Sequence, residues 1–301
     1  MPKTYTEQRN LYGSLTKNTS TANLALGDQL INDEYRALCA IRDFYFLYAT
    51  RTITTTSGTQ SKELPIDVDK VLGVTVTVGS TVHNPREVTS RKMWDDLNQS
   101  TYTSDAPEYF YVYDGKLGLW PTPATSDYVV SIYAKLKVTN LSRADYTTGT
   151  ITTATAGSTS ITGSGTSWAA PMAGRYIRIT QTDSANTGDD NWYEIASVGS
   201  ATTLTLVKPY AGASISAGSA NYTIGQVSLL PDEVQDAPVY KAVSVYWTGE
   251  DDKRAKEFKE LYEDRRALLL KARNGPTTSP AVDTENTRNI VNPNNYPTNL
   301  S

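Results

Sequence analysis

The sequence predicts an α+β protein. Helices from the two ends of the chain form a bundle, and the segment between them in the sequence forms antiparallel strands. Apolar residues recur at helical spacing near both ends, and a period of two replaces that spacing after Tyr48. An Asp-Gly pair lies between two β-forming runs. We expect four parts: a helical bundle from residues 1–48 and 227–273, an antiparallel β domain over 49–145, an inserted small β-sandwich or barrel over 146–226, and an extended tail over 274–301.

The first helix is predicted to begin at a capping box formed by Thr4 and Glu7, and to end near Leu15. After the polar break Lys17–Thr21, a second helix is expected to run to residue 48. Its apolar stripe would consist of Leu24, Ile31, Tyr35, Leu38 and Tyr45. Gly27 lowers the helix propensity of its first turns by about 1 kcal/mol relative to Ala.

The block after Tyr48 is predicted to be a mainly antiparallel sheet with one short helix. Strands are expected over Arg51–Thr56, Lys62–Ile66, the alternating run Val74, Val76 and Val78, and Tyr128–Val138. Thr89 is the expected cap of a helix over Ser90–Asn98, which carries Met93, Trp94 and Leu97.

A hairpin is predicted where Asp114-Gly115 joins Tyr109–Tyr113 to Lys116–Trp120, since both turn residues tolerate positive φ. The two-residue period places Phe110 and Val112 on one face and three tyrosines on the other. We expect one face to pack inside the protein. The other would be a docking platform made of Tyr109, Tyr111, Tyr113 and Trp120.

Residues 146–226 are rich in Thr, Ser, Gly and Ala, which with short strands and Gly-containing turns is typical of a small sandwich or barrel. The expected strands are Thr150–Thr155, Ser158–Thr162, Arg175–Thr180, Asn191–Val198, Thr202–Val207 and Asn221–Ile224. The expected buried anchors are Trp168, Tyr176, Ile177, Ile179, Trp192, Ile195, Leu204 and Leu206.

The helical pattern returns after Leu229. Asp236 is the expected N-cap of a helix with Pro238 in its first turn, where proline is tolerated. Gly249 breaks this helix, and a last one is predicted over Asp251–Arg273, with Ala255, Phe258, Tyr262 and Leu269 on its buried stripe. The tail that follows has no periodicity and is expected to fold on a partner.

Composition excludes several classes of function. The net charge of −4 argues against a protein that grips nucleic acid through a basic surface. The single cysteine excludes an intrachain disulfide, and no run of 18 apolar residues predicts a membrane span. The first ten residues lack the apolar core of a signal peptide. We therefore expect a soluble protein made in a reducing compartment. Its 20 tyrosines are suited to interfaces that are partly exposed to solvent.

No catalytic, cofactor or metal site is predicted. His83 has no motif around it, and one histidine and one cysteine cannot form a Cys/His metal cluster. Cys39 lies near the apolar stripe and is expected to be a small core residue. Acids that could serve glycoside hydrolysis or hold a cation are Asp183, Asp189 and Asp190, and the pair Asp95-Asp96, but loop acids are usually only solvated.

The order of these parts resembles the head-to-tail adaptor (connector, or head-completion) proteins of tailed bacteriophages. The residues that carry the resemblance are Leu30–Arg36, Leu64-Pro65-Ile66-Asp67, Pro107–Phe110, Leu119–Pro123 and Leu230-Pro231-Asp232-Glu233. It covers roughly residues 20–140 and 227–273, and the inserted block has no counterpart in the smallest members.

The resemblance implies a homo-oligomeric, commonly dodecameric, ring beneath the portal protein, at the head-tail junction of a virion assembled in the host cytoplasm. It also implies further partners among tail, nozzle or head-completion proteins, and double-stranded DNA that passes through the lumen without specific binding. The ring-packing residues would be Tyr35, Leu38, Tyr246, Trp247, Phe258 and Tyr262. The portal-binding residues in the tail would be Ile290, Val291, Tyr296 and Leu300.

Two other hypotheses remain open at this point. The inserted block could make the protein a tail-decoration or carbohydrate-binding protein that recognises a host surface. Alternatively, the loop carboxylates could make it a glycan-cleaving enzyme, which Asp189→Asn would inactivate.

Overall fold

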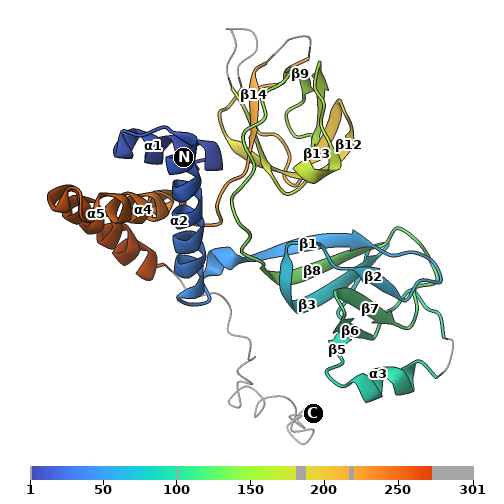
Figure 1. The fold of residues 1–301 in the computed structure, drawn as a ribbon. Helices are drawn as coiled ribbons and strands as arrows, with labels where there is room; N and C mark the ends of the chain where they lie inside the picture. Colours follow the sequence, from blue (N-terminus) through green and yellow to red (C-terminus); the bar gives the residue numbers. More distant parts are fainter. Residues whose placement is uncertain (1, 100–101, 181–187, 217–219, 273–301) are drawn as a thin grey trace, which may run out of the picture. The chain divides into compact units, whose positions relative to one another are not determined.

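The computed structural model describes residues 2–99, 102–180, 188–216 and 220–272, and within them it confirms the α+β class. The described residues form five α-helices and three sheets, in which every strand pair except β5 with β6 is antiparallel. The chain divides into two compact units (Figure 1). The first comprises residues 1–41 and 138–272, and the described part of the second lies within 42–137.

The first unit begins with α1 (Tyr5–Thr16) and α2 (Thr21–Ala40). The expected capping box is present: the Glu7 amide donates to Thr4 Oγ1 over 3.2 Å, and the Thr4 amide donates to Glu7 Oε2 over 2.9 Å. Two of the exposed amide donors at the start of the helix are thereby satisfied, which favours a helix that starts here.

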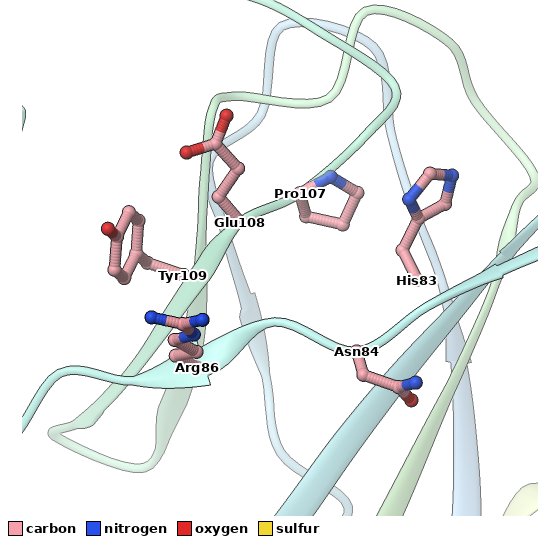
Figure 2. A pocket seen from close by; sticks show the side chains of 6 residues that line it. All are labelled: His83, Asn84, Arg86, Pro107, Glu108 and Tyr109. Carbon is pink, nitrogen blue, oxygen red and sulfur yellow. The ribbon is translucent and has the colours of Figure 1, made fainter. Parts of the chain in front are cut away.

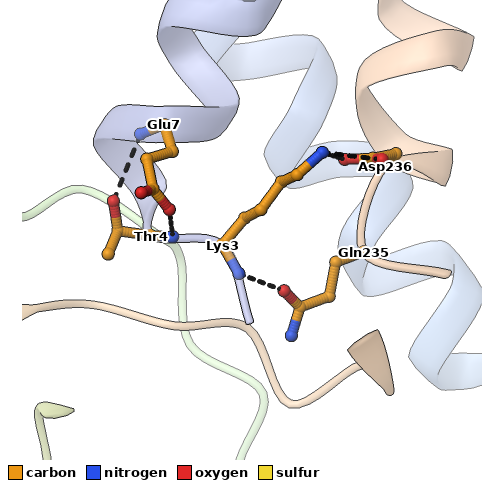
Figure 3. A network of polar contacts seen from close by, with 5 residues as sticks. All are labelled: Lys3, Thr4, Glu7, Gln235 and Asp236. Atoms are coloured by element: carbon orange, nitrogen blue, oxygen red, sulfur yellow. Dashed lines mark hydrogen bonds and ion pairs between the residues drawn. The ribbon is translucent and has the colours of Figure 1, made fainter. Parts of the chain in front are cut away.

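The C-terminal segment supplies a short 3₁₀ turn, η3 (Asp232–Val234), followed by α4 (Ala237–Trp247) and α5 (Asp252–Leu270). Asp236 occupies the N-cap of α4 as expected, but its side chain does not cap the helix. It instead accepts a 2.7 Å ion pair from Lys3 Nζ, and the Lys3 amide donates to Gln235 Oε1 (Figure 3). The start of the chain is thereby tied to the start of α4.

Helices from opposite ends of the chain share one hydrophobic core. Tyr12 of α1 and Ile31 of α2 are buried together with Val239, Ala242 and Val243 of α4. The blue and orange helices accordingly lie side by side in Figure 1. A hydrogen bond of 2.6 Å from the Tyr262 hydroxyl on α5 to Glu34 on α2 adds a second link between the two ends.

The expectation that α2 continues to residue 48 is wrong. The helix ends at Ala40, a 3₁₀ turn, η1, follows at Tyr45–Leu47, and strand β1 begins at Tyr48. Phe44 and Leu47 are buried, whereas Tyr45 is 51% exposed and does not belong to the apolar stripe of α2. Aromatic residues have only moderate helix propensity, and here their packing determines the backbone.

All six strands expected between residues 150 and 224 are present. They form one sheet in the order β14-β11-β12-β13-β10-β9. Their bounds are β9 Thr150–Ala154, β10 Ser160–Ser164, β11 Tyr176–Ile179, β12 Trp192–Ser200, β13 Thr203–Leu206 and β14 Tyr222–Gly225, with a 3₁₀ turn, η2, at Ala170–Met172. Of the eight expected anchors, six are buried, and Tyr176 and Trp192 are half-buried.

The two edges of this sheet approach each other. Isolated bridges join β9 to the segment before β14, at Ile151–Ala220 and Ala154–Ile215. The chain enters and leaves the sheet at one place, because Tyr146 and Ile224 exchange both main-chain hydrogen bonds, at 2.9 and 2.8 Å.

The second unit packs two four-stranded sheets against each other, in the orders β1-β8-β3-β4 and β2-β7-β6-β5. The bounds are β1 Tyr48–Thr54, β2 Ser61–Glu63, β3 Val68–Val78, β4 Thr81–His83, β5 Arg86–Glu87, β6 Tyr109–Tyr113, β7 Lys116–Trp120 and β8 Val129–Leu136. The core between them contains Val71, Val74, Val76, Phe110, Leu117, Leu119, Val130, Ile132 and Ala134.

Several boundaries in this unit differ from the prediction. Strands β4 and β5 were not expected, and β2 ends at Glu63, before the proline at 65, which cannot donate to a ladder. Helix α3 (Arg91–Leu97) has Ser90 rather than Thr89 as its N-cap, and Met93 is 42% exposed.

We predict that Gly27→Ala destabilises the protein although alanine is the better helix former. A Cβ atom at Gly27 would lie 2.4 Å from two ring carbons of buried Tyr12, where α1 crosses α2. Overpacking of this kind costs about 1–3 kcal/mol, which exceeds the propensity gain of about 1 kcal/mol. The measurement is the free energy of unfolding in urea.

The matched control for Gly27→Ala is Gln29→Ala, two residues along α2 at an exposed position. Its effect should lie within about 0.5 kcal/mol of zero. A stabilised Gly27→Ala variant would show that Tyr12 does not lie against the glycine.

Candidate functional site

The surface best suited to bind a partner in the second unit is the outer face of the β6–β7 hairpin. Asp114 and Gly115 connect the strands with φ of 48° and 70°, as a tight two-residue turn requires. Residues Tyr109 and Trp120 are paired across the ladder, as are Tyr111 and Gly118. Phe110 is buried against the facing sheet, whereas the side chains of the outer face are half-buried.

Aromatic rings stack along one half of this face. The ring centroid of Trp94 on α3 lies 5.4 Å from that of Tyr111, and the Tyr111 ring lies 5.3 Å from that of Tyr113. The Arg91 guanidinium lies 5.4 Å from the Tyr113 ring centroid, within cation–π distance. Gly118 makes the stacking possible, because a Cβ there would approach the Trp94 ring to 2.6 Å.

A second aromatic group occupies the proline-flanked end of the hairpin. Trp120 lies 5.9 Å from Tyr109 and 6.0 Å from Tyr102, centroid to centroid. Tyr102 is 51% exposed. Half-buried Tyr and Trp combine apolar area with a polar edge, a composition enriched in the centres of protein interfaces.

An open hollow of about 440 Å³ adjoins this second group (Figure 2). It is lined by His83, Asn84, Arg86, Pro107, Glu108 and Tyr109, which come from the end of β4, from β5 and from the entry to β6. The lining contains the positively charged Arg86 and the negatively charged Glu108, and its one hydroxyl group is the Tyr109 phenol. Its charged and amide side chains are suited to bind polar groups of a partner.

The other candidate catalytic residues are engaged in structural contacts. Cys39 is 4% exposed, and burial raises the pKa of its thiol to about 12, so the thiolate is not formed near neutral pH. Asp189 accepts hydrogen bonds from Asn191 and from the Tyr193 hydroxyl. Asp95 is paired with Arg91 at 2.9 Å.

No group of three or more His, Cys, Asp or Glu in the described ranges could hold a metal ion. Asp183 lies outside those ranges, and Asp190 is a loop residue with φ of 57°. None of the described helices is both long enough and apolar enough to cross a membrane.

The six residues expected to pack between copies differ in exposure. Tyr35, Leu38 and Tyr262 are buried within the first unit, and the Tyr35 hydroxyl accepts a 3.0 Å hydrogen bond from the Leu229 amide. Tyr246, Trp247 and Phe258 are half-buried. The four tail residues Ile290, Val291, Tyr296 and Leu300 lie outside the described residues.

The sequence did not indicate that Trp94, Arg91 and Tyr102 join the hairpin tyrosines. Trp94 was expected on a short helix, but nothing in its spacing shows which strand that helix covers. The glycine at 118, placed opposite Tyr111 in an otherwise β-forming run, was the available signal, because a strand glycine often marks a close approach.

We predict that Gly118→Ala disorders the aromatic face. The added Cβ displaces Trp94 from Tyr111, which should cost about 1–3 kcal/mol in the free energy of unfolding and reduce the near-ultraviolet circular dichroism. Gly73→Ala is the matched control, because this strand glycine has no atom within 4 Å of an added Cβ. Equal effects of the two substitutions would contradict the packing of Trp94 over Gly118.

Comparison with known proteins identifies the family to which this chain belongs. No curated protein matches the sequence. Residues 8–284 match the family described as SU10 adaptor protein, and this range contains most of α1, all of α2, α4 and α5, the hairpin and the six-stranded sheet. The match spans far more than half of the 301 residues. The chain therefore belongs to the SU10 adaptor protein family, a family of structural phage proteins rather than enzymes.

Proposed function

We propose that this protein is a head-to-tail adaptor that forms a ring under the portal, joins the portal to the tail and lets DNA pass. The observation that carries the proposal is the match to a phage adaptor family over residues 8–284. An adaptor interacts with other head or tail proteins and is a component of the virion. We further propose that the ring is a dodecamer and that it contacts the portal directly.

The helices of the first unit support a ring-forming role. Their common core joins helices from both ends of the chain, and apolar side chains remain exposed on these helices. These are Leu26 on α2, Val245 on α4, and Leu261 and Leu268 on α5, each between 43% and 45% exposed. Exposed apolar side chains on neighbouring helices are suited to pack against a neighbouring copy.

The buried residues Tyr35, Leu38 and Tyr262 would act in the ring indirectly, by fixing the helices that carry those exposed side chains. Tyr246, Trp247 and Phe258 retain half-exposed surface for direct contact. Head-to-tail packing of identical bodies closes into a ring when the rotation between copies permits closure.

The two remaining surfaces are assigned to the phage partners. In this proposal the aromatic face with Tyr109, Tyr111, Tyr113 and Trp120 meets the tail or nozzle. The tail residues Ile290, Val291, Tyr296 and Leu300 meet the portal by coupled folding and binding. The net charge of −4 is compatible with a lumen along which DNA moves without adhering.

The experiment mixes the purified full-length protein with purified portal rings and images the product by electron microscopy. We expect a second ring stacked on the portal. A chain that ends at Gly275 should lose at least tenfold in affinity for the portal, since the segment that folds on it is absent.

A chain carrying Tyr111→Ser serves as the control. The substitution changes the aromatic face that is proposed to meet the phage tail, so this variant should still attach to the portal. If the shortened chain attaches to the portal as well as the full-length chain does, the assignment of portal binding to the C-terminal segment is wrong. If the full-length chain neither forms rings nor attaches, the proposed function itself is wrong.

A further inference from the structure

Two segments of chain connect the helices of the first unit to the six-stranded sheet of the same unit. We call residues 138–145 the entry segment and residues 226–231 the exit segment. The side chain of Asn32 on α2, which is 7% exposed, holds the entry segment at Leu141. It accepts a 2.6 Å hydrogen bond from the Leu141 amide and donates one of 2.9 Å to the Leu141 carbonyl. A flexible linker between domains has few such contacts.

The exit segment is bonded both to α2 and to the entry segment. Its Leu229 amide donates a 3.0 Å hydrogen bond to the Tyr35 hydroxyl of α2. Its Gln226 side chain accepts hydrogen bonds from the amides of Ser142 and Arg143, over 2.8 and 2.9 Å. Because the two segments are joined to each other and to α2, a swinging motion of either one would break several of these hydrogen bonds.

The short segment of residues 3–7 bonds to both connecting segments and to α4. The Tyr5 amide donates a 2.8 Å hydrogen bond to the Gln226 carbonyl of the exit segment. The hydroxyl of Thr4, which is completely buried, donates one of 2.9 Å to the Asp145 carboxylate of the entry segment. The first residue of the segment makes the bonds to the start of α4 already described (Figure 3). One short segment therefore ties the helices to the route into and out of the sheet.

Residues 3–7 also lie directly against the sheet. A Cβ atom at Gly225, the last residue of β14, would lie 2.3 Å from Thr4 Cγ2. On β11, the Arg178 guanidinium lies 3.8 Å from the Glu7 carboxylate. The contact with the helical segment therefore includes the strands of the sheet and not the connecting segments alone.

We propose that residues 3–7 act as a latch that fixes the six-stranded sheet to the helices as a rigid arm. With the latch closed, the sheet presents its surface in one direction relative to α1 and α2. A domain that finds its partner by swinging on a tether needs connecting segments that are free to move. The inference goes beyond the proposed function and concerns the single chain, so it holds or fails independently of ring formation.

The test measures the distance between two spin labels on the full-length chain by pulsed electron paramagnetic resonance. The labels are attached at Gln29→Cys on α2 and Ser160→Cys on β10, both at exposed positions. Cys39 is 4% exposed and should not react with the label, which the chain without introduced cysteines verifies. We expect one narrow distribution of distances.

Gly225→Ala should open the latch, because the added methyl group displaces Thr4 from β14. The width of the distance distribution should then increase about twofold or more, as for domains that move relative to one another. Gly199→Ala is the matched control and should leave the width unchanged, because an added Cβ at this exposed strand glycine meets only Thr203. Gln226→Ala, which removes the side chain that joins the two connecting segments, is the second latch variant.

Amide hydrogen exchange separates an opened latch from an unfolded sheet. In an opened latch the Tyr5 amide should lose protection, whereas the amides of β11 should keep theirs. If β11 also loses protection in Gly225→Ala, the distribution of Gln226→Ala decides.

A broad or two-peaked distribution in the chain that carries only the two labels would overturn the rigid arm. A distribution that stays narrow after the Tyr5 amide has lost protection would show that residues 3–7 are not the latch. Failure to form rings on the portal, together with a narrow distribution, would count against the proposed function and leave the rigid arm intact.

Discussion

The contact on which the architecture depends is the packing of α1 and α2 against α4. Tyr12, Ile31 and Val243 are completely buried in it, although more than 200 residues separate the two ends of the chain. Gly27 lets α2 approach the Tyr12 ring, and the ion pair between Lys3 and Asp236 holds the entry to α1 against the entry to α4. Without this core the helices at the two ends would be isolated amphipathic segments, which are marginal in water.

Short-range signals in the sequence predicted much of the fold. The Thr4 capping box, the Asp114-Gly115 turn and the alternation of Val130, Ile132 and Ala134 each depend on a few neighbouring residues, and the helix and strands lie where these patterns place them. The end of α2 was missed, because Phe44 and Leu47 are buried by contacts that spacing alone does not reveal. The short strand β4 and its pairing with β3 were not predicted, for the same reason.

The candidate surfaces illustrate the same limit. The alternation of the hairpin tyrosines could be read directly, but the stacking of Trp94 on Tyr111 required knowing that α3 covers Gly118. Equally, strand β1 could be predicted from its β-branched residues, whereas its position at the end of a sheet follows from topology. Which strand lies at the end of a sheet is therefore a property of the fold that no window of sequence contains.

The hydrogen-bonded neighbours Tyr146 and Ile224 have a consequence for how this chain could have arisen. The polypeptide enters the six-stranded sheet and leaves it at hydrogen-bonded positions, so the segment between them begins and ends side by side. A short linker between its two ends would span the junction without displacing a helix. Lineages of adaptors could therefore gain, exchange or discard this module while the surrounding scaffold stays the same.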